Sequence, residues 1–94
     1  MSATGNPTPK VSLGRIVATP HALEVLALED ILAGLRRHEA ADWGEVPPED
    51  RESNDRALIE GTRIFSVHSS NKVRFWIITE ADRAVTTVLM PEDY

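Results

Sequence analysis

Hydrophobic and polar residues alternate along the last third of the chain, a pattern of period two that is typical of β-strands. Three runs rich in β-branched and aromatic residues cover residues 62–68, 73–79 and 85–90. The connections between them hold only a few residues, whereas parallel strands need a crossover of about a dozen or more. The pattern therefore predicts an antiparallel meander, with Asn71 in a left-handed conformation in the first hairpin loop.

Successive side chains of a strand point to opposite faces of the sheet, so the three runs divide into two sets. The more apolar set, which we expect to face the helices, is Phe65, Val67, Val73, Phe75, Ile77, Val85, Thr87 and Leu89. The mixed set on the other face is Ile64, Ser66, His68, Arg74, Trp76, Ile78, Thr86, Val88 and Met90. A difference of one residue in either hairpin loop would exchange part of one set for the other.

Upstream of these strands the apolar spacing changes from two residues to about 3.6, as on one side of a helix. Residues 20–41 are predicted to form one helix or a pair broken near Leu28, beginning at the N-cap Thr19. A further helix is predicted over residues 48–60, ended by Gly61.

The order of helices first and strands second predicts an α+β fold, with two to three N-terminal helices packed on a C-terminal antiparallel meander of three to four strands. The fourth strand would be residues 14–19, which fit either an edge strand or an extended lead-in, and we favour the strand. Residues 1–12 are expected to form a flexible arm before a single domain over residues 13–94. The predicted core is Leu23, Leu26, Ile31, Leu35, Leu58, Phe65, Val67, Phe75, Ile77 and Leu89.

Charge and composition narrow the function. The chain has 94 residues, no cysteine and a net charge of −5. Residues 20–60 hold eleven acidic residues against four arginines, a balance of −7, whereas the region from residue 61 onward is neutral. Phosphate binding needs an excess of Lys and Arg, so nucleic acid is not expected as a direct ligand. The lack of cysteine and of any apolar run of membrane length makes a cytoplasmic location the default expectation.

Motifs for metal, cofactor or nucleophilic chemistry are missing from the sequence. No two of His21, His38 and His68 have the helical i, i+4 spacing. No calcium loop, glycine-rich phosphate loop or Gly-x-Ser-x-Gly pattern occurs either. We therefore expect no metal site and no cofactor.

The C-terminal region carries the string WIITEADR over residues 76–83, followed by TTVL and PEDY. It resembles the C-terminal signature of a family of short, uncharacterised bacterial proteins carried on plasmids and other mobile elements. The earlier strings IVATP, DWG and GTRI fit the same pattern, so the resemblance covers roughly residues 14–94. It implies mobile-element biology and brings no established activity with it.

A looser resemblance is to the barnase and RelE group of small ribonucleases, in which helices precede an antiparallel meander. It implies a ribonuclease toxin in which His68, Arg74, Glu80 and Arg83 supply the general acid, the general base and the phosphate-binding cations. A structural interpretation also exists, because His68 lies at a strand end next to a turn, and Glu80 and Arg83 lie in a hairpin loop. No residue-by-residue motif of those enzymes matches, so a non-enzymatic function is favoured.

The sheet is apolar on both sides, and the face away from the helices therefore needs a cover. That cover would be the N-terminal segment, a second copy of the chain in a homodimer, or another protein. Trp76 and Ile78 are the expected anchors, because large apolar side chains dominate binding surfaces. The predicted binding residues are Trp76, Ile78, Arg74, Ser66, Thr86, Val88 and Trp43, the last being either a core residue or an exposed contact.

Three hypotheses for the function follow. The first is a small acidic, non-enzymatic interaction protein of mobile-element origin, which binds a host or defence protein through its sheet face or its acidic helices. The second is the ribonuclease toxin. The third is an acidic mimic of nucleic acid that inhibits a nucleic-acid-binding protein.

Overall fold

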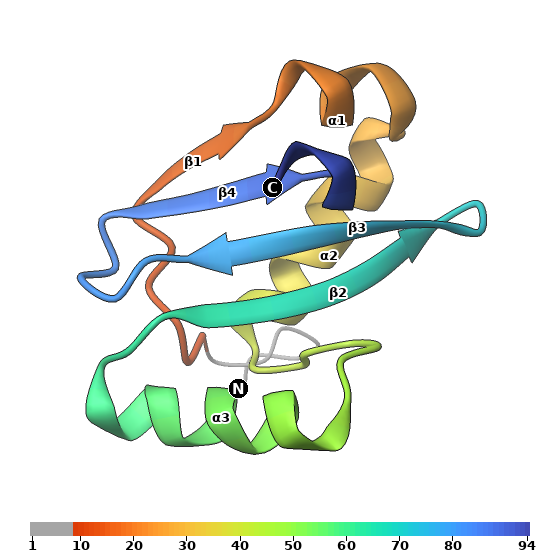
Figure 1. The fold of residues 1–94 in the computed structure, drawn as a ribbon. Coiled ribbons are helices and arrows are strands. Elements are labelled where there is room, and N and C mark those ends of the chain that lie inside the picture. The colour runs from red at the N-terminus through yellow and green to blue at the C-terminus, as the bar shows by residue number, and fades with distance from the viewer. Residues whose placement is uncertain (1–8) are drawn as a thin grey trace, which may run out of the picture.

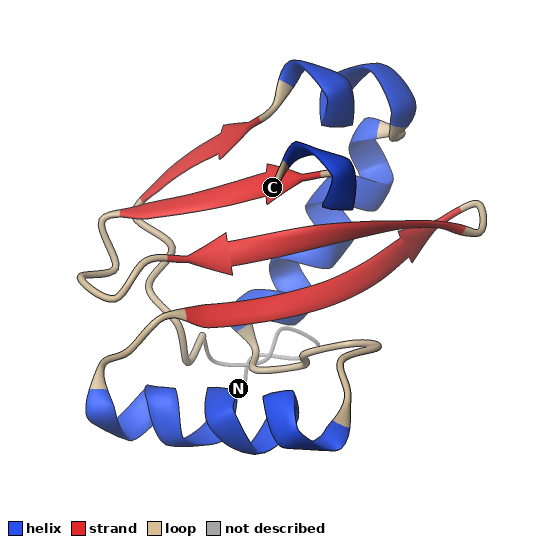
Figure 2. Cartoon of the chain, viewed as in Figure 1, coloured by secondary structure: helices blue, strands red, loops and turns tan. Residues whose placement is uncertain are grey.

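The computed structural model describes residues 9–94, which form helices and strands in the predicted order (Figure 1; Figure 2). The α+β fold is thus confirmed. The elements are β1 (Arg15–Ala18), α1 (Pro20–Val25), α2 (Leu28–Glu39), α3 (Pro48–Glu60), β2 (Ile64–Ser70), β3 (Val73–Thr79), β4 (Val85–Leu89) and a short 3₁₀ helix η1 (Pro91–Asp93).

The four strands form one sheet in the order β1-β4-β3-β2. Strands β2, β3 and β4 pair antiparallel, which confirms the meander. The predicted edge strand also exists, but β1 pairs parallel with β4, so the sheet is mixed and not purely antiparallel. Parallel pairing is open to β1 because three helices and two strands separate it from β4 along the chain.

The helix boundaries follow from local chemistry. The Thr19 hydroxyl accepts a hydrogen bond of 3.0 Å from the Ala22 amide and caps α1, as its sequence position predicts. The chain then turns at Leu26, so the predicted helix is a broken pair. Gly61 ends α3 with φ 76°, in the left-handed region that favours glycine.

The first hairpin loop decides which side chains share a face of the sheet. It consists of Asn71 and Lys72 alone, both with positive φ, so Ser70 lies opposite Val73. An odd-numbered residue of β2 therefore faces the same way as an even-numbered residue of β3. The left-handed Asn71 is confirmed. The predicted sharing of faces between β2 and β3 is wrong, because Phe65 and Phe75 could lie on the same face only with a hairpin loop one residue longer or shorter.

The inner face, which packs against α2, therefore differs from the predicted one (Figure 1). Phe75 and Ile77 face inward as expected, but their neighbours from β2 and β4 are the other set. The predictions that placed Ser66, Thr86 and Val88 on the outer face beside Trp76 are wrong, since all three are fully buried on the inner face. The outer face instead carries Phe65, Val67, Arg74, Trp76, Ile78, Val85, Thr87 and Leu89.

The core between α2 and the sheet depends on close contact at one glycine. A Cβ atom at Gly34 would lie 2.9 Å from the Phe75 Cζ atom, closer than carbon atoms pack. Glycine normally weakens a helix interior, but here it lets α2 approach the Phe75 ring. Ile31 and Leu35 pack beside it in the same cluster.

A second cluster holds α3 against the edge of β2. Trp43, Ala57 and Ile64 are buried in it. The Asn54 side chain also closes this edge, since its amide donates to the Phe65 carbonyl at 2.6 Å and its carbonyl accepts from the Phe65 amide at 3.1 Å. Val11 is buried in the same cluster, so the expected flexible arm over residues 1–12 is too long. Residues 1–8 of that arm lie outside the described part of the chain.

Most of the predicted core is buried, although parts of it lie on the other face. Leu58 and Phe65 are half-buried, and Leu23 is 59% exposed, which makes that prediction wrong. Ala22 and Leu26 take the inward positions of the short α1, so Leu23 points to solvent. The predicted residues that are buried are Leu26, Ile31, Leu35, Val67, Phe75, Ile77 and Leu89.

We expect Phe75→Ala to lower the free energy of unfolding by about 3 to 5 kcal/mol, because the ring is fully buried against Gly34. Val73→Ala, on the same strand and face but 37% exposed, is the matched control and should cost less than about 1 kcal/mol. Urea unfolding of both variants measures the difference. Equal losses would contradict the placement of Phe75.

Candidate binding pocket on the outer face of the sheet

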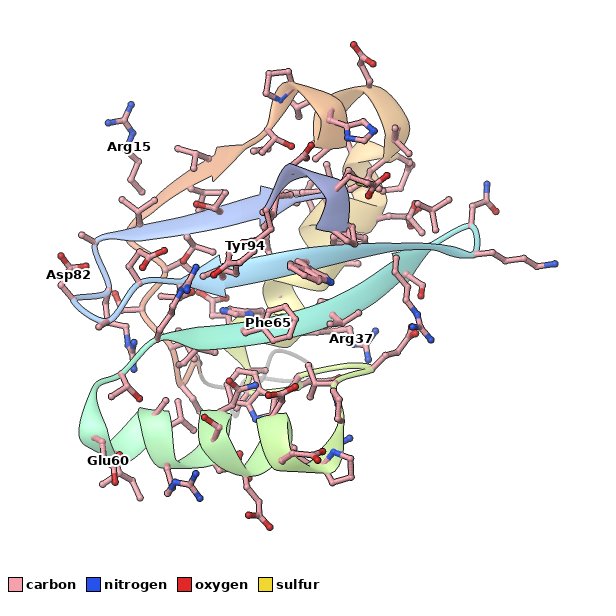
Figure 3. The ribbon with its side chains drawn as sticks, viewed as in Figure 1. Arg15, Arg37, Glu60, Phe65, Asp82 and Tyr94 are labelled. Atoms are coloured by element: carbon pink, nitrogen blue, oxygen red, sulfur yellow. The ribbon has the colours of Figure 1, made fainter. Side chains whose placement is uncertain are left out.

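Three aromatic rings gather on the outer face of the sheet. The Phe65 and Trp76 rings come from neighbouring strands, with centroids 5.0 Å apart and planes at 84°. The Tyr94 ring, beyond η1, lies 5.6 Å from the Trp76 ring at 63°. Figure 3 shows Phe65 and Tyr94 over the same side of β2 and β3. The rings meet edge to face and form corners, not a stack.

A pocket of about 290 Å³ opens beside these rings, between the outer face and α3. Asp50, Ser53 and Asn54 form its helical wall, since their i, i+3, i+4 spacing places them on one side of α3. The Asn54 side chain is already hydrogen-bonded to the Phe65 backbone. The residues that line the pocket are Asp50, Ser53, Asn54, Arg63, Phe65, Trp76, Ile78 and Tyr94.

Arg63 lies at the rim of the pocket and is engaged on both sides. Its Nη1 atom donates to the Tyr94 hydroxyl at 3.0 Å, and its guanidinium carbon is 5.4 Å from the Tyr94 ring centroid. Its Nε atom lies 3.7 Å from the Glu80 carboxylate. The Tyr94 ring is thus already in contact with the Arg63 guanidinium, and the Glu80 carboxylate offsets the charge of that guanidinium.

The structure brings some of the predicted binding residues together and separates others. Trp76 and Ile78 line the pocket. Arg74 is on the same face but pairs with Glu45 at 3.0 Å. Trp43 is buried, and its indole N–H donates to Asp55 at 3.0 Å, so it is a core residue.

The sequence interpretation missed the rest of the lining, on α3, Arg63, Phe65 and Tyr94. The i, i+3, i+4 spacing of Asp50, Ser53 and Asn54 was a signal that they share a side of one helix. The alternation in the sequence predicts Phe65 on the opposite face, and nothing in the local sequence shows that Tyr94 folds back over Trp76.

The four residues of the ribonuclease alternative do not form a site. His68 is buried on the inner face, whereas Arg74 extends from the outer face toward Glu45. The Arg83 guanidinium donates to the Thr62 and Ala57 carbonyls, at 2.6 and 2.9 Å, and closes the end of α3. These residues therefore do not place an acid, a base and a cation around one phosphate.

Buried polar side chains on and beside the inner face form a chain of hydrogen bonds. The donor and acceptor of each bond follow from the bond before it. The Thr86 hydroxyl donates to the Leu13 carbonyl at 2.8 Å, so it accepts from Thr79 at 2.7 Å. Thr79 therefore accepts from His38 Nε2 at 2.8 Å. A neutral His38 then accepts at Nδ1 from the Ser66 hydroxyl, at 2.6 Å.

The chain ends at His68. The Ser66 hydroxyl donates its one hydrogen bond to His38, so its oxygen accepts a hydrogen bond from His68 Nε2 at 3.0 Å. That bond leaves His68 Nδ1 as a bare acceptor, buried and without a partner among the described residues. Burial lowers the pKa of His38 to about 3 and the pKa of His68 to about 4. Both rings are therefore neutral at pH 7, as the chain of bonds requires.

Comparisons with protein-family models, curated proteins and solved structures found no match for this chain. The resemblance to plasmid-carried proteins thus stays a prediction. Within residues 9–94, no helix is both long and apolar enough to cross a membrane. Over the same residues, no three His, Cys, Asp or Glu side chains gather where they could hold a metal ion.

The two buried histidines predict an acid-sensitive fold. In the unfolded chain each takes up a proton near its ordinary pKa of 6.5, but in the fold each stays neutral to about pH 4. Stability is therefore lost as pH falls below 6.5, by up to about 2.7 kcal/mol per pH unit for the two groups together. Urea unfolding at pH 7, 6 and 5 measures this loss.

Variants separate this effect from general acid denaturation. His68→Gln removes one of the two groups and should reduce the slope by about half. His21→Gln is the control, because His21 is outside the buried chain and its pKa is raised by its hydrogen bond to Asp93. A stability of the wild type that does not change between pH 7 and 5 would contradict the assignment.

Proposed function

We propose that this protein is a small interaction domain, which binds a segment of a protein partner on the outer face of its sheet and anchors one side chain in the pocket. The observation that carries the proposal is the group of three aromatic rings around a pocket of about 290 Å³. Aromatic residues in a partly exposed hollow are typical of the anchors that dominate protein interfaces.

The position of α3 supports the same proposal. The sequence offered two separate surfaces, the sheet face and the acidic helices. In the fold they adjoin, because the acidic α3 supplies one wall of the pocket and the sheet supplies the other. A partner side chain that enters the pocket therefore meets the acidic residue Asp50 directly. The sheet face and the acidic helix are then parts of one continuous binding surface.

As part of this proposal, the partner is a host or defence protein, because the chain resembles proteins carried on plasmids and other mobile elements. The acidic mimic of nucleic acid would use the charge of the helices without the pocket. The aromatic pocket favours a partner that contributes a side chain, since charge mimicry needs no apolar hollow.

Trp76→Ala tests the proposal, because Trp76 contacts both other rings. A displayed peptide library is selected against the wild-type protein, and the affinity of the enriched peptides is measured for each variant. Loss of an anchor of this kind should weaken binding by about 2 kcal/mol, or roughly 30-fold.

Ile59→Ala is the control, because Ile59 is a large apolar residue of α3, the helix that forms one wall of the pocket, but is 88% exposed and is not part of the pocket. It should leave binding unchanged. Thermal unfolding of Trp76→Ala confirms that the variant is folded before its affinity is compared. Peptides that bind the Trp76→Ala protein as tightly as the wild type, or that depend on Ile59, would contradict the proposal.

A further inference from the structure

We infer that the side chain taken up by the pocket is basic, a lysine or an arginine presented by the partner. This inference rests on the proposed function and adds the chemical class of the ligand. It follows from three features of the described lining: an unpaired carboxylate, aromatic walls at steep angles, and an arginine whose charge is already offset.

Asp50 is the first feature. It is half-buried in the helical wall of the pocket. Among the described residues, no ion pair involves its carboxylate, and Arg56 of the same helix pairs with Glu52 instead, at 4.0 Å. A carboxylate that is partly withdrawn from water gains most from a cation that enters the same space.

The aromatic walls are the second feature. The Phe65, Trp76 and Tyr94 rings meet at 84° and 63°, so they enclose a corner in which a cation can approach ring faces from more than one side. The protein itself shows that this group accepts a guanidinium, because Arg63 already lies over the Tyr94 ring. The rings of Phe65 and Trp76 have no such cation among the residues described.

Charge balance is the third feature. Arg63 would repel a second cation if it were alone, but Glu80 lies 3.7 Å from its Nε atom. Asp50 and Arg63 are the charged residues of the lining and balance each other, so Glu80, which pairs with Arg63 from outside the lining, brings this group to a net charge of −1. The rest of α3 adds acidic residues outside the pocket. A volume of about 290 Å³ suits one long side chain, being at the lower limit of pockets for whole small molecules, about 300 to 1,000 Å³.

The two tryptophans provide a direct test, since one lines the pocket and the other is buried in the core. The indole N–H signals of nitrogen-15-labelled protein are followed by NMR while N-acetyl-arginine amide, N-acetyl-lysine amide or N-acetyl-citrulline amide is added. Citrulline has nearly the shape of arginine without its charge. We expect saturable shifts of the Trp76 signal with the two basic probes, binding of citrulline at least about tenfold weaker, and a Trp43 signal that does not move.

Asp50→Asn should weaken binding of the basic probes by at least about fivefold, since it removes the charge and keeps the shape. Glu49→Gln is the matched control, because Glu49 is the adjacent acid on α3 and does not line the pocket. It should change binding by less than about twofold, because Glu49 is exposed outside the lining, where water and salt screen its charge.

Three results would overturn the inference: equal affinity for citrulline and arginine, no effect of Asp50→Asn, or a Trp76 shift with N-acetyl-glutamate amide in place of the basic probes. The proposed function fails separately. If peptides selected on the protein need Trp76 but carry no conserved basic residue, partner binding stands and the ligand class is wrong. If they bind without Trp76, the pocket is not the partner site.

Discussion

The two-residue turn of Asn71 and Lys72 is the constraint on which the rest of this structure depends. Both residues adopt positive φ, so the strands on either side pair with Ser70 opposite Val73. This phase places the Phe65 ring on the same face as the Trp76 ring. With a loop one residue longer, Phe65 would point toward α2, and the outer face would have no aromatic corner for Tyr94 to complete.

The same phase determines what lies on the inner face. It turns Ser66 and His68 inward, opposite Ile77 and Phe75, where polar groups are costly unless they are hydrogen-bonded. The chain through His38 and Thr79 satisfies nearly all of them. The pocket outside and the polar chain inside are therefore two consequences of one register. A polar core of this kind also favours that register over others, because a slipped strand would leave its groups unpaired.

Features of the fold that depend on local residue spacing were predictable. The three C-terminal strands, the break between α1 and α2, the Thr19 cap and the Gly61 stop all follow from periodicity and capping chemistry. The faces of β2 and β4 were not predictable in the same way, because they depend on the parity of a loop whose ends shift by one residue. The parallel partner of β1 was missed because its contact with β4 is set by packing far along the chain. Of the site, Trp76 and Ile78 were predicted, and the helical wall and Tyr94 required the tertiary fold.

The register itself is open to one direct measurement, the nuclear Overhauser contacts of the Trp76 indole. The structure predicts cross-peaks from the Trp76 ring to the Phe65 and Tyr94 rings, whose centroids lie 5.0 and 5.6 Å away. It predicts none to the Val88 methyl groups, which are on the opposite face. Cross-peaks from Trp76 to Val88, with none to Phe65, would show that the strands pair in the other phase and that the pocket does not exist.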